Sequence, residues 1–185
     1  MLTSQLEIIE QAQRYLNTVS EEEYTVIISP NFISSAGTHI RHVIDHYLAI
    51  MSGIESKLID YDIRLRGSQL ESSPALAKEK LFEIAEWLQN LSDDDLTKKV
   101  TLSTEVSITN KSIKKVQSSI ARELIFASSH AVHHYAMIAQ ISFAQETLST
   151  KDSTSHLFGL APATATFMRP KSKNKTETKP SSIKG

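Results

Sequence analysis

The sequence predicts an all-α protein: a four-helix bundle with one small β-hairpin before the last long helix. Apolar residues recur every three or four positions over long segments, as in amphipathic helices. The chain has only five Gly and five Pro in 185 residues, fewer than the turns of a many-stranded β architecture require. Its length suits one domain with a single buried core.

The first two helices are expected in the first third of the chain. Ser4 and Glu7 match the capping box S-x-x-E, so the first helix should begin there and continue to about Val19. The second should run from about residue 34 to Gly53, because glycine is common just past the end of a helix.

The remaining elements complete a bundle domain over residues 1–168. Ser73-Pro74 marks the start of a third helix, with Ser as N-cap and Pro as the first helical residue. Apolar and polar residues alternate between 99 and 116, which predicts a hairpin. The longest helix should begin at Ser118 or Ser119 and end near Gln145, and apolar residues of 157–168 should pack back on the body.

Composition excludes several kinds of site. The chain has no cysteine, which excludes disulfides, thiolate metal ligands, iron–sulfur clusters and a cysteine nucleophile. No run of roughly 18 apolar residues occurs, and the first residues lack the basic start and apolar stretch of a signal peptide. We therefore expect no membrane association and a cytoplasmic location.

The end of the chain differs from the body in charge. Six of the 20 Lys and Arg, but one of the 21 Asp and Glu, lie after residue 168. Segment 169–185 is polar and has no apolar stripe, so we expect a disordered basic tail. The acidic excess of the body opposes nucleic acid, and we expect no nucleic-acid partner.

Six of the seven histidines form two clusters, one on each of two expected helices: His39, His42 and His46, then His130, His133 and His134. On a helical wheel, Glu123, His130 and His134 share one column of the apolar face, and His133 lies about 100° away. Burying such groups without partners costs about several kcal/mol each. One turn of helix separates the pair in H-x-x-x-H, so both rings can reach one metal ion about 2 Å from each nitrogen.

The wheel of the second helix does not choose among its histidines. His39 and His46 lie slightly nearer the apolar centre than His42, while small residues leave room beside His42. We expect one metal ligand from this helix, and the wheel leaves His39, His42 and His46 as candidates. A hydrogen-bond network between Glu123 and the histidines could satisfy the same core without a metal.

Three segments, GTHIRHVIDHYLAIMSG, SSIARELIFASSHAVHHYAMIA and LFGLAPATATF, occur in this order. With them the chain resembles the DinB/YfiT-like superfamily over roughly residues 5 to 168. The resemblance implies a DinB-like four-helix bundle, a homodimer and a three-histidine metal site. The ligands that it implies are His42, which is followed by an aliphatic residue as in the family, and the pair His130 and His134. His46 is the substitute if His42 is not the ligand, and His39, His46 and His133 otherwise lie beside the site.

Three imidazoles suit a divalent ion such as zinc, nickel or iron and leave one position open. There a metal can activate a thiolate, or lower the pKa of a bound water from about 15.7 to about 7. The resemblance implies a metal-dependent thiol S-transferase with a small-molecule thiol substrate. The doubled His133-His134 and the basic tail depart from some thiol-transferase members, so two alternatives stay open: a metal-dependent hydrolase, and a non-catalytic bundle with a structural or sensory metal.

Five further residues bear on the site. Glu123 is the candidate for orienting a ligand histidine or moving a proton. Asp45, one turn from His42, is expected to be a solvated acid. Tyr61, Asp62 and Arg66 could line the mouth of a pocket but are expected to form a plain loop.

Overall fold

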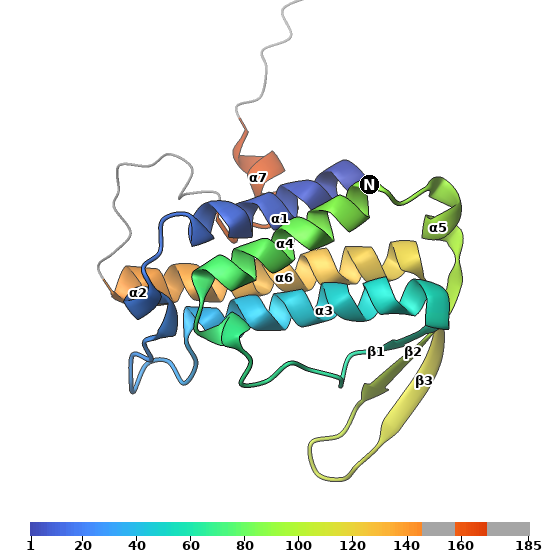
Figure 1. The fold of residues 1–185 in the computed structure, drawn as a ribbon, viewed down its shortest axis with the longest axis horizontal. Coiled ribbons are helices and arrows are strands. Elements are labelled where there is room, and N and C mark those ends of the chain that lie inside the picture. Colours follow the sequence, from blue (N-terminus) through green and yellow to red (C-terminus); the bar gives the residue numbers. More distant parts are fainter. Residues whose placement is uncertain (146–157, 170–185) are drawn as a thin grey trace, which may run out of the picture.

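The computed structural model describes residues 1–145 and 158–169. Four long helices lie side by side in it (Figure 1): α1 (Leu2–Leu16), α3 (Ala36–Ser56), α4 (Pro74–Gln89) and α6 (Ile120–Ala144). Shorter elements join and flank them: α2 (Glu21–Thr25), the 3-10 turn η1 (Gln69–Glu71), α5 (Asp93–Thr97) and α7 (Pro162–Met168).

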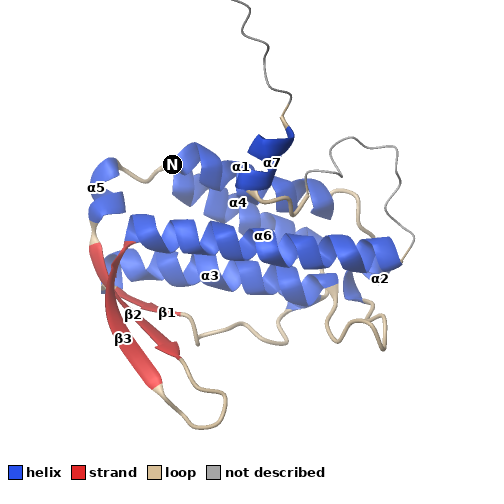
Figure 2. Cartoon of the chain, turned by 180° about the vertical axis from the view of Figure 1, so that it is seen from behind, coloured by secondary structure: helices blue, strands red, loops and turns tan. Residues whose placement is uncertain are grey.

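A three-stranded sheet lies at one end of the bundle and corrects the predicted fold class (Figure 2). Strand β1 (Leu58–Asp60) pairs in parallel with β2 (Lys99–Glu105), and β2 pairs antiparallel with β3 (Ile113–Ser119). The expected hairpin is present as β2 and β3, but β1 extends it to a mixed sheet. The all-α prediction is therefore wrong: the described chain is a mixed α and β structure in which helix predominates.

Strand β1 forms because α3 ends in a tight left-handed turn. Lys57 has φ 57° and donates its backbone N–H to the Gly53 carbonyl, and the chain then turns into β1. The sequence predicted that this helix ends at about Gly53. The structure shows that it continues to Ser56. Gly53 instead permits close approach of β1, since a Cβ there would lie 2.4 Å from Cγ1 of the buried Ile59.

Side-chain caps account for most helix starts. The predicted starts of α4 and α6 are confirmed, because the Ser73 and Ser119 hydroxyls accept hydrogen bonds from backbone N–H groups three residues ahead. Helix α1 instead begins at Leu2 without a side-chain cap, so Ser4 does not start it. The short helices α2 and α5 were not predicted, although each has a capping box: Ser20 with Glu23, and Ser92 with Asp95.

The core lies among the four long helices and the inner side of the sheet. Its fully buried members are mainly aliphatic: Ile9, Ile40, Ile44, Ile50, Ile59, Leu81, Ile84, Leu88 and Ile120. Tyr24 and Tyr47 are also fully buried, and their phenols donate to the Leu70 carbonyl at 2.7 Å and to Gln5 Oε1 at 3.1 Å. Both buried hydroxyls therefore have partners.

The segment after α6 packs on the body only in part. The Phe158 ring stacks against Tyr15 and Tyr135, with centroids 5.3 and 5.1 Å apart, which confirms the expected return of this segment. Phe167 and Met168 are 88% and 67% exposed, against expectation. The expectations for Leu157 and for the basic tail beyond Arg169 fall outside the described residues.

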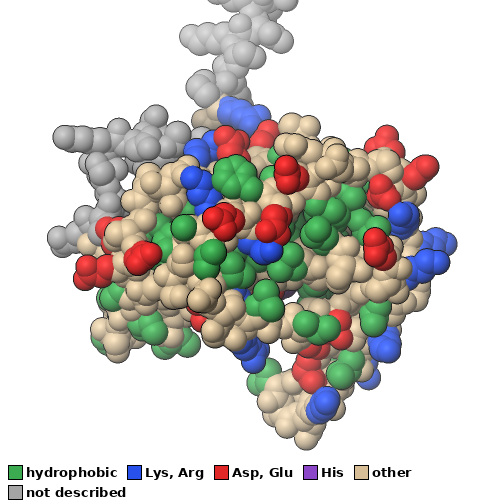
Figure 3. Space-filling view, in the orientation of Figure 1, with side chains coloured by type: hydrophobic (Ala, Val, Ile, Leu, Met, Phe, Trp, Pro, Cys, Tyr) green, Lys and Arg blue, Asp and Glu red, His purple; other side chains and the backbone are tan. Residues whose placement is uncertain are grey.

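The surface mixes both signs of charge. Figure 3 shows acidic and basic side chains interspersed over one face of the molecule, with apolar groups between them. Among the described residues, no helix has both the length and the apolar composition needed to cross a bilayer.

Candidate metal centre

Helices α3 and α6 pack antiparallel and bring histidines of both expected clusters together. The ring of His39, early in α3, meets His134, with their Nδ1 atoms 2.8 Å apart. One turn further along α3, His42 Nε2 lies 3.0 Å from His130 Nε2. His130 Nε2 in turn lies 3.1 Å from His134 Nε2, so the Nε2 atoms of His42 and His134 both lie close to that of His130.

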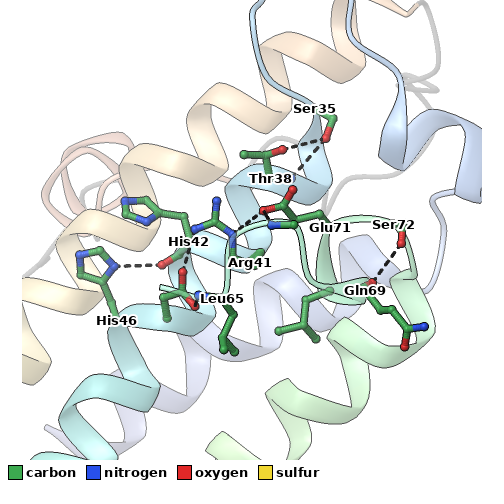
Figure 4. Close-up of polar contacts among 12 residues, drawn as sticks. Ser35, Thr38, Arg41, His42, His46, Leu65, Gln69, Glu71 and Ser72 are labelled. Atoms are coloured by element: carbon green, nitrogen blue, oxygen red, sulfur yellow. Dashed lines mark hydrogen bonds and ion pairs between the residues drawn. The ribbon is translucent and has the colours of Figure 1, made fainter. Parts of the chain in front are cut away.

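His46 joins this group from the next turn of α3. Its Nδ1 donates to the His42 carbonyl at 2.9 Å, as Figure 4 shows. Because a carbonyl oxygen only accepts, the hydrogen is on Nδ1 and the lone pair of His46 is on Nε2. Nitrogen atoms of His42, His46 and His130 all lie within 4.8 Å of one another. The His46 ring also stacks on Tyr61, with centroids 4.8 Å apart.

Hydrogen bonding alone does not satisfy these three Nε2 atoms. A neutral ring nitrogen carries either one hydrogen or one lone pair and can form one linear hydrogen bond. His130 Nε2 has two close neighbours, the Nε2 atoms of His42 and His134. One of its two contacts is therefore left without a proper hydrogen bond, and a cation among the three lone pairs would remove this conflict.

Imidazole nitrogens are suitable ligands for a divalent cation, and two separations among His42, His130 and His134 are close to those of a metal site. Nitrogens about 2.1 Å from a tetrahedral ion lie about 3.4 Å from one another. The observed separations of 3.0 and 3.1 Å are a few tenths of an ångström shorter, which small ring rotations would correct. Imidazole nitrogen suits zinc, nickel and iron, in agreement with the metals expected from the sequence.

The surroundings keep these rings uncharged. Burial, followed by the charges of neighbouring histidines, lowers the pKa of His42 to about 2 and that of His134 to about 3. Burial and the same kind of neighbours lower the pKa of His130 to about 4, and burial lowers the pKa values of His39 and His46. Neutral imidazole is the form that binds a metal, so the site is ready for one at neutral pH.

Three of the histidine rings are in contact with solvent. His42, His130 and His134 are each partly exposed, whereas His46 is 6% exposed. His133 points outward and is exposed, as the wheel predicted. A ligand could therefore approach the Nε2 cluster from the side of the partly exposed rings.

Glu123 is buried as predicted but bonds to residues other than histidines. It is fully buried at the start of α6 and accepts hydrogen bonds from Tyr61 Oη at 2.8 Å, Arg122 Nη1 at 2.8 Å and the Ser118 hydroxyl. Its link to the site is indirect, through the Tyr61 ring that stacks on His46. The structure thus places Glu123 behind Tyr61, where it holds that ring in position.

The segment after β1 is tied to α3 by a buried ionic network, and the expectation of a solvated Asp45 is wrong. Arg41 Nη1 lies 2.7 Å from Asp45 Oδ2. Arg41 Nε lies 2.8 Å from Glu71 Oε1 (Figure 4). Asp45 Oδ1 also accepts the Leu65 N–H at 3.2 Å. The wheel missed this network because the partners of α3 come from a loop distant in sequence.

Of the three loop residues considered in the sequence, Tyr61 contacts a histidine of the site. Tyr61 is buried and packs against His46, whereas Asp62 and Arg66 are exposed, and Asp62 accepts the Glu105 N–H at 2.7 Å. Arg64 was not singled out in the sequence. Its Nε donates to the Tyr61 carbonyl at 3.1 Å, and its charge helps lower the pKa values of His42, His46 and His130.

Part of this chain is similar to a curated protein. No family model and no solved structure matches the chain. A protein of Rhizopus delemar named FK506-binding protein 5 is 36% identical over 107 residues, which cover 58% of this chain and 26% of that protein. The match spans about a quarter of the relative's length, so its name describes a protein much larger than the shared region.

Proposed function

We propose that this protein is a divalent-metal-binding, DinB-like protein whose metal activates a small-molecule thiol for transfer. The observation that carries the metal proposal is that His130 Nε2 lies 3.0 Å from His42 Nε2 and 3.1 Å from His134 Nε2. The thiol S-transferase activity is supported by the motif resemblance and by the chemistry of an open three-imidazole site.

When bound, the ion would act as a Lewis acid that lowers the pKa of a thiol at its open position. The protein's own part is to hold three neutral rings at fixed spacing and to leave one side accessible. Phe126 stacks on His130, with centroids 5.7 Å apart, and Tyr61 stacks on His46. These apolar faces exclude water from one side of the site, while the positive charge of Arg64 favours an anion such as a thiolate.

One observation favours a second candidate, a closed structural or sensory site. His46 is buried, its Nε2 lone pair is free, and its ring belongs to the group within 4.8 Å. If His46 supplied a fourth nitrogen, no position would remain for a substrate. The His46→Gln variant separates the two candidates, because an open site keeps its metal without His46 and a four-histidine site loses affinity.

The first test is metal content. The chain would be purified without a histidine tag or chelator, and its metals measured by elemental analysis beside the His130→Ala/His134→Ala variant. We expect about one equivalent in the parent and none in the folded variant, because removal of two of three ligands abolishes the site. His133→Ala removes an exposed neighbour on the same helix and is the matched control. A parent that binds no zinc, nickel or iron after reconstitution would overturn the proposal.

The second test asks whether the site is open. In cobalt-substituted protein, added thiol should produce a thiolate-to-cobalt charge-transfer band and change the visible spectrum. An unchanged spectrum at saturating thiol would reject thiol activation. Hydrolysis of ester or amide probes by the same metal-loaded protein, with no response to thiols, would point to the hydrolase alternative.

Homodimer formation and a cytoplasmic location belong to the same proposal. The resemblance to DinB/YfiT-like proteins supports the dimer, and sedimentation equilibrium of the full chain measures it. A monomer at concentrations well above those of the metal assay would remove dimerisation from the proposal without affecting the metal site.

A further inference from the structure

We propose that His39 is the positioning residue of this site: it fixes the tautomer and ring orientation of His134 and is itself held by Ser34. The inference rests on the proposed function, since it concerns how one of the proposed ligands is prepared for metal. It also has a consequence for the metal-free protein that can be measured separately.

The geometry is a short chain of hydrogen bonds leading away from the Nε2 cluster. His134 Nδ1 lies 2.8 Å from His39 Nδ1, and His39 Nε2 lies 2.9 Å from the Ser34 hydroxyl oxygen. Both histidines are partly buried, and the two rings are tilted by 44° with centroids 5.1 Å apart. His134 thus has one nitrogen toward His130 and the other toward His39.

This chain has two possible directions, and only one is compatible with a metal. If Ser34 donates to His39 Nε2, then His39 Nδ1 donates to His134 Nδ1, and the hydrogen of the neutral His134 ring is on Nε2, which cannot then bind an ion. If His39 Nε2–H donates to Ser34, His39 Nδ1 accepts from His134 Nδ1–H, and His134 Nε2 has its lone pair free. The proposal assigns the second direction.

The same geometry excludes His39 as a ligand. Its Nδ1 faces His134 and its Nε2 faces Ser34, so both nitrogens are already engaged within the protein. Of the three α3 histidines that sequence analysis left open, His39 therefore supports a ligand instead of being one. Metal-bound histidines commonly donate their second N–H to such a partner, and loss of the partner costs about 10- to 100-fold in metal affinity.

Three variants test this role by the affinity for cobalt and by the visible spectrum of the cobalt-loaded protein. His39→Leu removes the acceptor and should weaken cobalt binding about 10- to 100-fold and alter the spectrum. His39→Asn keeps an oxygen acceptor near the position of Nδ1 and should restore affinity to within about threefold. Ser34→Ala removes only the outer partner and should have an intermediate effect. His133→Leu is the matched control and should bind as the parent does.

A measurement on the metal-free protein keeps the test independent of the proposed function. Ring ¹⁵N chemical shifts should show His134 protonated on Nδ1 and His39 protonated on Nε2. The reverse tautomers, or parent-like affinity and spectrum in His39→Leu, would overturn the positioning role. A parent that binds no metal yet shows the expected tautomers would instead reject the metal function and leave the hydrogen-bond chain supported.

Discussion

The buried network of Arg41, Asp45 and Glu71 should contribute more to stability than any surface ion pair of this chain that the structure describes. The Arg41 and Asp45 side chains are only 7% and 4% exposed. In Arg41→Met, Asp45 would keep only the Leu65 N–H as a partner, and its charge would be buried without compensation. Breaking one side of such a pair costs about 3–5 kcal/mol of unfolding free energy.

Urea denaturation of the metal-free protein measures this cost. With a slope of about 2 kcal/mol per molar urea, the midpoint of Arg41→Met should fall by about 1.5–2.5 M. The Arg14–Glu10 pair has a nitrogen–oxygen distance of 2.8 Å but is about half exposed, so Arg14→Met is a matched control. It should cost no more than about 0.5 kcal/mol.

The double variant Arg41→Met/Asp45→Leu tests the physical reason. Replacement of both charges by apolar groups removes the uncompensated carboxylate, so the double variant should recover at least half of the loss. A loss below about 1 kcal/mol in Arg41→Met, within the range of an exposed pair, would refute the argument. A double variant as unstable as Arg41→Met would show that the charge of Asp45 is not the cause.

Three further predictions follow from single features of the structure. Gly53→Ala should lower the unfolding free energy by about 1–3 kcal/mol in urea denaturation, although alanine favours helix, because its Cβ would meet Ile59; Ser52→Ala is the control. Arg64→Gln should raise divalent-metal affinity by roughly threefold to tenfold at low salt and by less at high salt, measured by calorimetric titration; equal affinities at low salt would contradict this. Burial raises the pKa of all five tyrosines, which are Tyr15, Tyr24, Tyr47, Tyr61 and Tyr135. Phenolate absorbance should therefore be absent well above pH 10 in the folded protein but should be present at that pH in urea.

The sign of the tyrosine effect follows from proton linkage. Above about pH 10 the unfolded chain loses phenolic protons that the folded protein retains, so the folded state binds more protons. The tyrosine contribution to the unfolding free energy should therefore be constant below that pH and should fall as the pH rises through and beyond it. A folded protein whose phenols titrate near pH 10, as free tyrosine does, would contradict the buried positions of these side chains.

Local pattern predicted the elements that are long and amphipathic. The capped starts at Ser73 and Ser119 and the strand alternation after Lys99 depend on neighbours within a few residues, and the structure confirms them. Strand β1 could not be predicted in this way. It has three residues, too few for an alternating pattern, and its partner β2 begins about 40 residues later in the chain.

The candidate site shows the same division between local and non-local information. The wheel of the last helix placed Glu123 on the buried face, with His130 and His134 in the same column, because all three belong to one helix. It could not choose among His39, His42 and His46, since that choice depends on how far α3 is shifted along α6. The structure gives each a different environment: His39 contacts His134, His42 contacts His130, and His46 donates to the His42 carbonyl.

Helix α3 connects the stability prediction to the proposed site. One of its sides carries the histidines that face α6, and another carries Arg41 and Asp45, which hold the loop with Tyr61, Arg64 and Glu71. Tyr61 stacks on His46, and the charge of Arg64 helps lower the pKa values of His42, His46 and His130. Loss of Arg41 should therefore loosen the loop side of the site, where a substrate would be oriented. The Nε2 spacing should change less, because it is set by contacts between α3 and α6. A folded Arg41→Met protein should consequently retain most of its metal affinity while losing affinity for an anionic ligand.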